Sequence, residues 1–122
     1  MIDDDKLIAE FIEIKVREWK PREHTSLVIL DEDGCLDFDE IEFYNPRHDW
    51  NQLMLAVIKM EKLGYAMHID PWSVEIVEYR SGKENTILSY DRDYEDNPIM
   101  HYYYPLVEFI KWYNKNLTDE TK

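Results

Sequence analysis

The sequence is poor in the residues that most often build special sites. Its 122 residues include a single cysteine, Cys35, and only three glycines. One cysteine excludes an intramolecular disulfide and a zinc site made of thiolates, and it fits a reducing compartment. With so few glycines there is no glycine-rich loop that could hold a phosphate group. Disulfide scaffolds, thiolate zinc folds and phosphate-binding loops are therefore excluded.

Basic residues and long apolar runs are also scarce. The chain has 14 Lys and Arg against 27 Asp and Glu, a formal net charge of −13. Such a surface repels phosphate backbones and anionic lipids. No stretch approaches the ~18 consecutive apolar residues of a membrane span, and the first residues are acidic where a secretory signal is basic. We therefore expect a cytoplasmic protein without a cofactor that binds neither nucleic acid directly nor a membrane.

The chain does contain enough apolar material for a folded core. Hydrophobic residues make up 44% of it and aromatic residues 14%. Both fractions are too high for a disordered chain, and the length is typical of one domain. A single domain over residues 1–122 is expected.

Hydrophobic periodicity predicts three helices. They are expected over residues 3–19, from the cap signal at residues 45–46 up to Gly64, and over about residues 105–116. Gly64 fits the position just after a helix. Pro105 either opens the last helix or kinks one that begins near Ile99.

Segments rich in strand formers predict antiparallel strands. A hairpin is expected from residues 26–30 and a return strand at 35–43, with a bulge near residues 39–40. A three-stranded meander is expected over residues 65–69, 73–79 and 86–90. The order helix, hairpin, helix, meander, helix predicts an α+β fold. In it, an antiparallel sheet of three to five strands packs with three helices.

Three segments have the order and spacing of a known family. They read KLIAEF at residues 6–11, DWNQLM at 49–54 continuing to KLGY at 62–65, and VEFIKWYN at 107–114. Together they resemble the phage ABA sandwich domain, a family of small, mostly uncharacterised phage and prophage proteins. The resemblance implies an α–β–α sandwich and a viral or prophage origin, hence a place in the host bacterial cell. The resemblance implies no catalytic residues, and it does not extend to residues 25–43.

The turn after the first predicted strand resembles the first motif of haloacid-dehalogenase-type phosphotransferases. Residues 27–36 read LVILDEDGCL, so Asp31 would be the nucleophile and Asp33 the acid and base. Residues that would complete the magnesium site and steady the phosphoryl group are Asp91, Asp93 or Asp96, and Lys83. This alternative requires residues 27–30 to form a central parallel strand. It also requires several βαβ units of ~30 residues, for which the chain has little room.

The same turn partly matches an EF-hand loop. With Gly34 as the sixth position, the ligands would be Asp31, Asp33, Asp37 and Glu40. Ile29, however, stands where the first carboxylate is needed, and the preceding residues favour a strand. The alternative is an Asp-rich hairpin turn without a metal. The four histidines, expected at the surface because they lack the spacing of metal ligands, are His24, His48, His68 and His101.

Carboxylates and tyrosines gather in two segments. Residues 31–42 hold seven carboxylates and no basic residue. Residues 91–96 hold four carboxylates, with Arg92 as their only basic residue. Tyrosine is enriched at interface hot spots, so acid and tyrosine together suit a basic protein partner. The predicted partner-binding residues are Asp31, Glu32, Asp33, Asp37, Asp39, Glu40, Glu42, Asp91, Asp93, Glu95, Asp96, Tyr94, Tyr102 and Tyr103. The alternative is a solvated surface with tyrosines at the edge of the sheet.

The resulting hypothesis is a non-enzymatic phage or prophage accessory protein that binds a host or phage protein. In the more specific form of this hypothesis, the carboxylates occupy the positions of phosphates in the nucleic-acid groove of a defence or replication enzyme. The alternatives are a small magnesium-dependent phosphatase and a virion or assembly component that forms a stable homo-oligomer.

Overall fold

The computed structural model describes residues 2–20, 25–37, 39–70, 73–80, 82–91 and 99–120, with side chains described up to residue 116. These residues form three helices and five strands. In chain order they are α1 (Ile2–Phe11), β1 (Val16–Trp19), β2 (Ser26–Ile29), α2 (Trp50–Lys62), β3 (Tyr65–Ile69), β4 (Ser73–Arg80), β5 (Lys83–Asp91) and α3 (Met100–Glu120).

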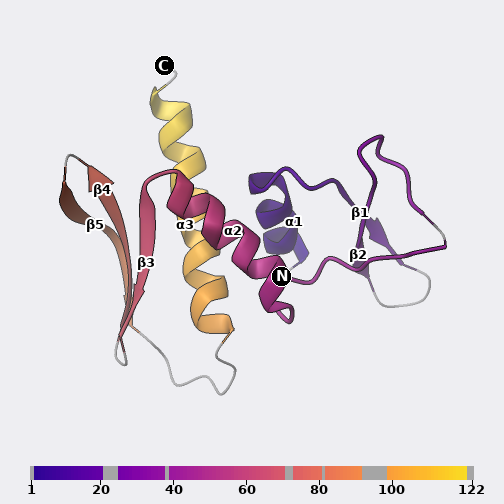
Figure 1. Cartoon of the computed structure of the whole chain (residues 1–122), viewed down its shortest axis with the longest axis horizontal. Coiled ribbons are helices and arrows are strands. Elements are labelled where there is room, and N and C mark those ends of the chain that lie inside the picture. The colour runs from indigo at the N-terminus through magenta and orange to yellow at the C-terminus, as the bar shows by residue number, and fades with distance from the viewer. Residues whose placement is uncertain are drawn as a thin grey trace.

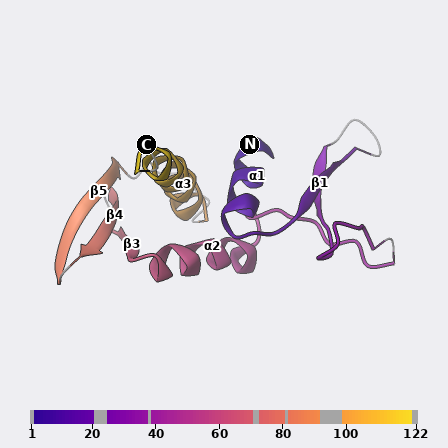
Figure 2. The same ribbon diagram turned by 90° about the horizontal axis from the view of Figure 1, so that it is seen from above.

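The strands form two antiparallel sheets at opposite ends of the molecule. One sheet pairs β1 with β2, and the other is the meander β3-β4-β5. Figure 1 shows the three helices between them. In Figure 2, α2 and α3 lie on the same side of the three-stranded sheet. The predicted α+β class, with helices packed on an antiparallel sheet, is confirmed. The helices form the middle layer here, whereas an α–β–α sandwich has its sheet in the middle.

The core lies where the helices meet the inner face of the three-stranded sheet. Its largest fully buried apolar side chains come from all three helices and from β4, and include Ile8, Leu53, Met60, Ile76, Leu106 and Phe109. The expected meander is confirmed, but its middle strand does not alternate cleanly. Ile76 and its neighbour Val77 are both 0% exposed. The register shift beside them leaves Ile87 without a partner on β4, so the bulged strand is β5.

The first helix is shorter than its apolar pattern predicts. It ends at Phe11, and residues 16–19 of the predicted helix form β1 instead. Two backbone bonds close the helix end, from Glu13 N to Glu10 O at 3.1 Å and from Ile14 N to Ala9 O at 2.9 Å. This is a Schellman motif with Glu13 in the left-handed conformation, at φ 60°. The helix prediction is wrong beyond this point because the β-branched and aromatic residues that follow pair with β2.

The expected hairpin partner of β2 is also wrong. β2 pairs along its whole length with β1, and the later segment contacts it only at the bridge between Val28 and Phe43. Two bonds flank this bridge, from Ile29 N to Glu42 O and from Tyr44 N to Leu27 O, both at 2.9 Å. The described part of residues 35–43 forms no ladder beyond this bridge, so the bulge expected near residues 39–40 does not arise.

Of the remaining helix boundaries, the start of α2 differs from the prediction, whereas the end of α2 and the start of α3 agree with it. α2 begins at Trp50 behind the cap Asp49, whose carboxylate accepts from the backbone of residues 51 and 52, so the cap predicted at residues 45–46 is wrong. Gly64 follows α2 with φ 95°, as predicted. α3 begins at Met100 and contains Pro105, which selects the earlier of the two predicted starts.

We expect Glu13→Gly to raise the free energy of unfolding by about 1 kcal/mol. The left-handed conformation costs a residue with a side chain ~1–2 kcal/mol, and the greater freedom of glycine in the unfolded chain offsets part of the gain. Urea unfolding measures the change, with Glu10→Gly inside α1 as the control that lowers stability. A Glu13→Gly protein no more stable than the wild type would contradict strain at this position.

Candidate functional site

All seven carboxylates of residues 31–42, called here the acidic segment, are exposed. They are Asp31, Glu32, Asp33, Asp37, Asp39, Glu40 and Glu42. Figure 1 shows this part of the chain looping outward next to β1 and β2, at the end of the molecule away from the three-stranded sheet. The structure therefore presents this predicted charge to solvent.

The acidic segment keeps its charge uncompensated. Within the described residues, none of its carboxylates forms an ion pair with a lysine or arginine. Lys15 does reach the segment, but its ammonium donates to the backbone oxygen of Glu32. Two carboxylates have a structural role. Asp31 accepts from Asp33 N and Cys35 N at 3.0 and 2.7 Å, and Asp37 accepts from Asp39 N at 3.0 Å. These bonds are those of an Asp-rich turn.

Apolar surface adjoins the acidic segment on two sides. The rings of Trp19 and Phe43 lie 5.7 Å apart, and Phe43 is 49% exposed. A groove of about 510 Å³ runs beside α2, and its apolar lining includes Ile14, Leu30 and Leu55. Its rim carries three members of the acidic segment, Asp31, Glu32 and Glu42. Charge and apolar area thus share one end of the molecule.

The second predicted group of acids does not join this surface, as far as it is described. Asp91 ends β5, in the sheet at the opposite end of the molecule (Figures 1 and 2). Asp93, Tyr94, Glu95 and Asp96 lie outside the described residues.

The two tyrosines predicted on α3 have different environments. Tyr102 is half-buried, with its ring edge-on to Trp50 at 5.2 Å. Tyr103 is 0% exposed, so its assignment to the binding surface is wrong. Because α3 starts at Met100, Tyr103 falls on the inner face of the helix.

The arrangement that the phosphatase alternative requires is not found among the described residues. β2 is antiparallel to β1 and so is not a central parallel strand. Asp31 is engaged in the turn, while Lys83 and Asp91 belong to β5 in the other sheet. The described residues of the assigned active site, Asp31, Lys83 and Asp91, are thus spread over both ends of the molecule.

The EF-hand alternative lacks its ligand geometry. Asp31, Asp33, Asp37 and Glu40 are all described, yet no three His, Cys, Asp or Glu side chains in the described ranges form a group that could hold a metal ion. His68 is hydrogen-bonded at the surface, 3.0 Å from the Tyr79 hydroxyl and 3.3 Å from Glu84. His48 is exposed, His101 is half-buried and His24 lies outside the described residues.

A buried polar network that the sequence analysis missed surrounds Asp5. This carboxylate on α1 is 3% exposed. The Tyr103 hydroxyl donates to its Oδ1 at 2.7 Å, and Arg47 Nε donates to its Oδ2 at 3.3 Å. Burial raises the pKa of Asp5, and the Tyr103 hydrogen bond and the Arg47 charge partly oppose that rise. The signal was present in the sequence, because Asp5 lies three and four residues before Ile8 and Ala9 on the buried face of α1.

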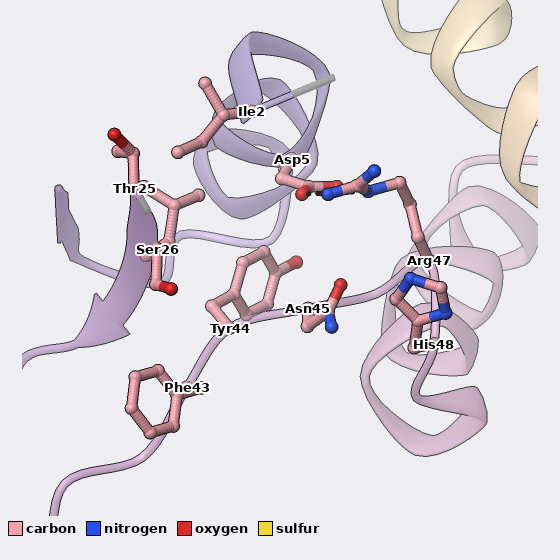
Figure 3. A pocket seen from close by; sticks show the side chains of 10 residues that line it. Ile2, Asp5, Thr25, Ser26, Phe43, Tyr44, Asn45, Arg47 and His48 are labelled. Carbon is pink, nitrogen blue, oxygen red and sulfur yellow. Dashed lines mark hydrogen bonds and ion pairs between the residues drawn. The ribbon is translucent and has the colours of Figure 1, made fainter. Parts of the chain in front are cut away.

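A pocket of about 390 Å³ opens beside this network, between α1, β2 and the chain that leads into α2 (Figure 3). Two buried polar atoms here, the Tyr44 hydroxyl and Asn45 Oδ1, have no hydrogen-bond partner among the described residues. Burial, followed by the charge of Asp5, raises the pKa of Tyr44, so its hydroxyl stays protonated. Both atoms are closed to solvent, so each is a buried polar group that lowers the stability of the fold.

Removing one hydroxyl from Tyr44 and from Tyr103 should change stability in opposite directions. Tyr103→Phe should lower the free energy of unfolding by about 1.5–3 kcal/mol, because a bond to a charged acceptor is lost. Tyr44→Phe should raise it by about 1 kcal/mol, because a buried hydroxyl without a partner is removed. Urea unfolding of both variants measures the difference. A loss of stability in Tyr44→Phe would show that its hydroxyl is satisfied.

Asp5 should also make stability depend on pH. Its pKa is raised in the folded state above the value of 3.8 expected when exposed, so the folded protein keeps the proton that the unfolded chain has lost. The free energy of unfolding of the wild type, relative to Asp5→Asn, should therefore fall as pH rises from 3.8 through the folded-state pKa, and then level off. Urea unfolding at a series of pH values tests this. A difference that rises with pH would contradict the assignment.

Comparison with known proteins identifies no relative of this chain. The sequence matches no protein-family model, and neither a curated protein nor a solved structure shows significant similarity to the chain. None of the described helices has both the length and the apolar character needed to cross a bilayer.

Proposed function

We propose that this protein is a non-catalytic accessory protein of a phage or prophage that binds a basic protein in the cytoplasm of the host bacterium. The observation that carries the proposal is the acidic segment, with its seven exposed carboxylates and no ion pair to a described lysine or arginine. A net charge of −13 extends the negative field around it. Such a surface attracts a positively charged protein and speeds its encounter.

Complementary charge speeds association and favours a basic partner, but a stable complex also needs apolar contact area. The exposed Phe43 with the half-buried Trp19, and the groove lined by Ile14, Leu30 and Leu55, supply this area next to the acidic segment. Protein interfaces commonly combine aromatic and aliphatic anchors with a polar rim. The surface supports a protein partner better than a small anionic substrate, which the carboxylates would repel.

The run of seven exposed carboxylates indicates the kind of partner. Carboxylates displayed along an exposed segment resemble the repeated negative charges of a nucleic-acid backbone. A defence or replication enzyme with a basic nucleic-acid groove offers the complementary surface. In this proposal the protein inhibits that enzyme by occupying the groove.

Neutralising part of the acidic segment should slow association with the partner. The test variant changes Glu32, Glu40 and Glu42 to glutamine and keeps Asp31 and Asp37, whose carboxylates hold turns. The matched control changes the exposed residues Glu10, Glu61 and Glu108 to glutamine. At low salt the test variant should associate about tenfold more slowly than the control, with a weaker dependence on salt.

The partner for this measurement is captured with tagged protein from infected bacterial cells and then purified. Short duplex DNA should compete with the protein for it. Capture of no basic protein, or equal association rates for the test and control variants, would contradict the proposed function. Association that slows as expected without competition by DNA would contradict only the nucleic-acid mimicry.

A further inference from the structure

One face of α2 carries apolar side chains at the surface. Its other face packs into the core through residues that include Leu53 and Met60. Leu55 and Ile58 are instead 51% and 47% exposed, and residues three apart on a helix lie next to each other. A helix that covers a core normally has polar residues at such positions. In Figure 2, α1 and α3 both lie on the same side of α2, so neither helix covers its opposite side.

A groove follows this exposed strip along the helix. The groove of about 510 Å³ described above is lined by Gln52 and Leu55 from the first half of α2. A second groove, of about 420 Å³, is lined by Leu55, Ile58 and Lys62. Because Ile14 and Leu55 line both, the two form one continuous surface, called here the α2 groove. At 1.5 Å per residue, Gln52 and Lys62 lie about 15 Å apart along the helix axis.

The two ends of the α2 groove carry opposite charge. The end near Gln52, called the acidic end, has Asp31, Glu32 and Glu42 on its rim. The other end, called the lysine end, is lined by Lys62. Among the described residues, Glu32, Glu42 and Lys62 form no ion pair. These three charges are therefore available to an occupant of the groove.

The remaining charged residues of the groove keep this contrast. At the acidic end, Lys15 donates to the backbone oxygen of Glu32. At the lysine end, Lys59 donates to the backbone oxygen of Phe11 and lies 4.9 Å from the centroid of its ring. Glu13 lines both ends. The acidic end thus has four acidic residues and one basic residue, and the lysine end has one acidic residue and two basic residues.

The charges decide what can fill the whole groove. An occupant must present a basic group to the acidic end and an acidic group to the lysine end. A uniformly basic partner would meet the Lys62 ammonium with a like charge. A second copy of this chain presents both charges in the required places when its α2 runs antiparallel. In a parallel pair Lys62 would face Lys62, and Glu42 would face Glu42.

We propose that two copies of this chain form a symmetric dimer through the α2 groove, with their α2 helices antiparallel. Contacts across a two-fold axis occur in reciprocal pairs. With the axis between Leu55 and Ile58, each Ile58 packs on Leu55 of the other copy, which removes both exposed side chains from water. Ile14, half-buried in the groove beside them, extends the apolar contact.

The same axis brings the opposite ends of the two grooves together. Counted from the axis, Lys62 of one copy lies opposite Asn51 of the other. Gln52, next to that position, donates to the backbone oxygen of Phe43 at 2.8 Å, so this part of α2 adjoins the residue that follows Glu42. The Lys62 ammonium therefore pairs with the Glu42 carboxylate of the other copy, and this pair occurs twice.

The dimer does not rest on the proposed function, because it needs only this chain. It covers part of the groove that the proposed function assigns to a basic partner, so the two compete and the partner binds the monomer. The carboxylates of the acidic segment that do not line the groove are Asp33, Asp37, Asp39 and Glu40. They stay exposed in the dimer.

Sedimentation equilibrium of the purified protein tests whether the dimer forms. At about 150 mM salt, charges more than ~8 Å apart are screened, which limits the repulsion between two chains of net charge −13. The apparent mass should rise with protein concentration from 14.9 kDa toward twice that value, with a dissociation constant on the order of 10–100 µM for so small an apolar centre. A mass that stays at 14.9 kDa up to about 500 µM, or that rises beyond twice this value, would overturn the proposal.

A charge placed in the centre of the interface should break the dimer. Ile58→Asp should raise the dissociation constant at least about tenfold, because the new carboxylate would be buried against Leu55 of the other copy. Tyr104→Asp adds the same charge at an exposed position on α3 and should leave the constant unchanged. Urea unfolding checks that both variants are folded. Equal dissociation constants for the two variants would overturn the proposal.

An exchange of charges tests the antiparallel arrangement. Lys62→Glu and Glu42→Lys should each raise the dissociation constant about fivefold, because each places like charges opposite each other twice. The protein with both substitutions keeps the wild-type net charge and should return to within about twofold of the wild-type constant, because both pairs re-form in reverse. A double variant that dimerises no better than the single variants would overturn the antiparallel dimer.

Discussion

The arrangement of this protein depends on one buried carboxylate. Asp5 receives hydrogen bonds from Tyr103, 98 positions later in the sequence, and from Arg47, 42 positions later. It therefore ties α1 to α3 and to the chain that leads into α2. A buried charge is tolerated only where such partners are present, so the three segments must come together around it. Separate backbone bonds, from Ile29 N to Glu42 O and from Tyr44 N to Leu27 O, hold the end of the acidic segment against β2 next to the pocket.

The molecule presents two surfaces with different chemistry. The acidic segment is exposed, negatively charged and free of ion pairs to described lysines or arginines, which suits encounter with a large basic partner. The pocket is partly open, and in it the Asp5 carboxylate is paired with the Arg47 guanidinium. Phe43, which pairs with Trp19, and Tyr44, which lines the groove beside α2, also line the pocket, so the pocket adjoins the proposed partner surface.

Local sequence patterns predicted the parts of the fold that local interactions decide. The α+β class, the meander, Gly64 after α2 and the exposed acidic turn all follow from periodicity or from turn chemistry. The patterns failed where distant segments compete for one element. Residues 16–19 have helical spacing but pair with β2, which in turn displaces the expected return strand. Helical spacing places Asp5 on the buried face of α1, but its partners Tyr103 and Arg47 could not be predicted from spacing, because they meet Asp5 only in the folded chain.

The central claim is that a protein partner covers the end of the molecule that carries the acidic segment. Hydrogen–deuterium exchange of the free protein and of its complex with the captured partner tests this claim most directly. The account predicts slower exchange in the complex for the described amides of residues 29–44 and of the groove beside α2. Exchange in β3, β4 and β5 should not change. Protection of the three-stranded sheet, with no change in residues 29–44, would contradict it.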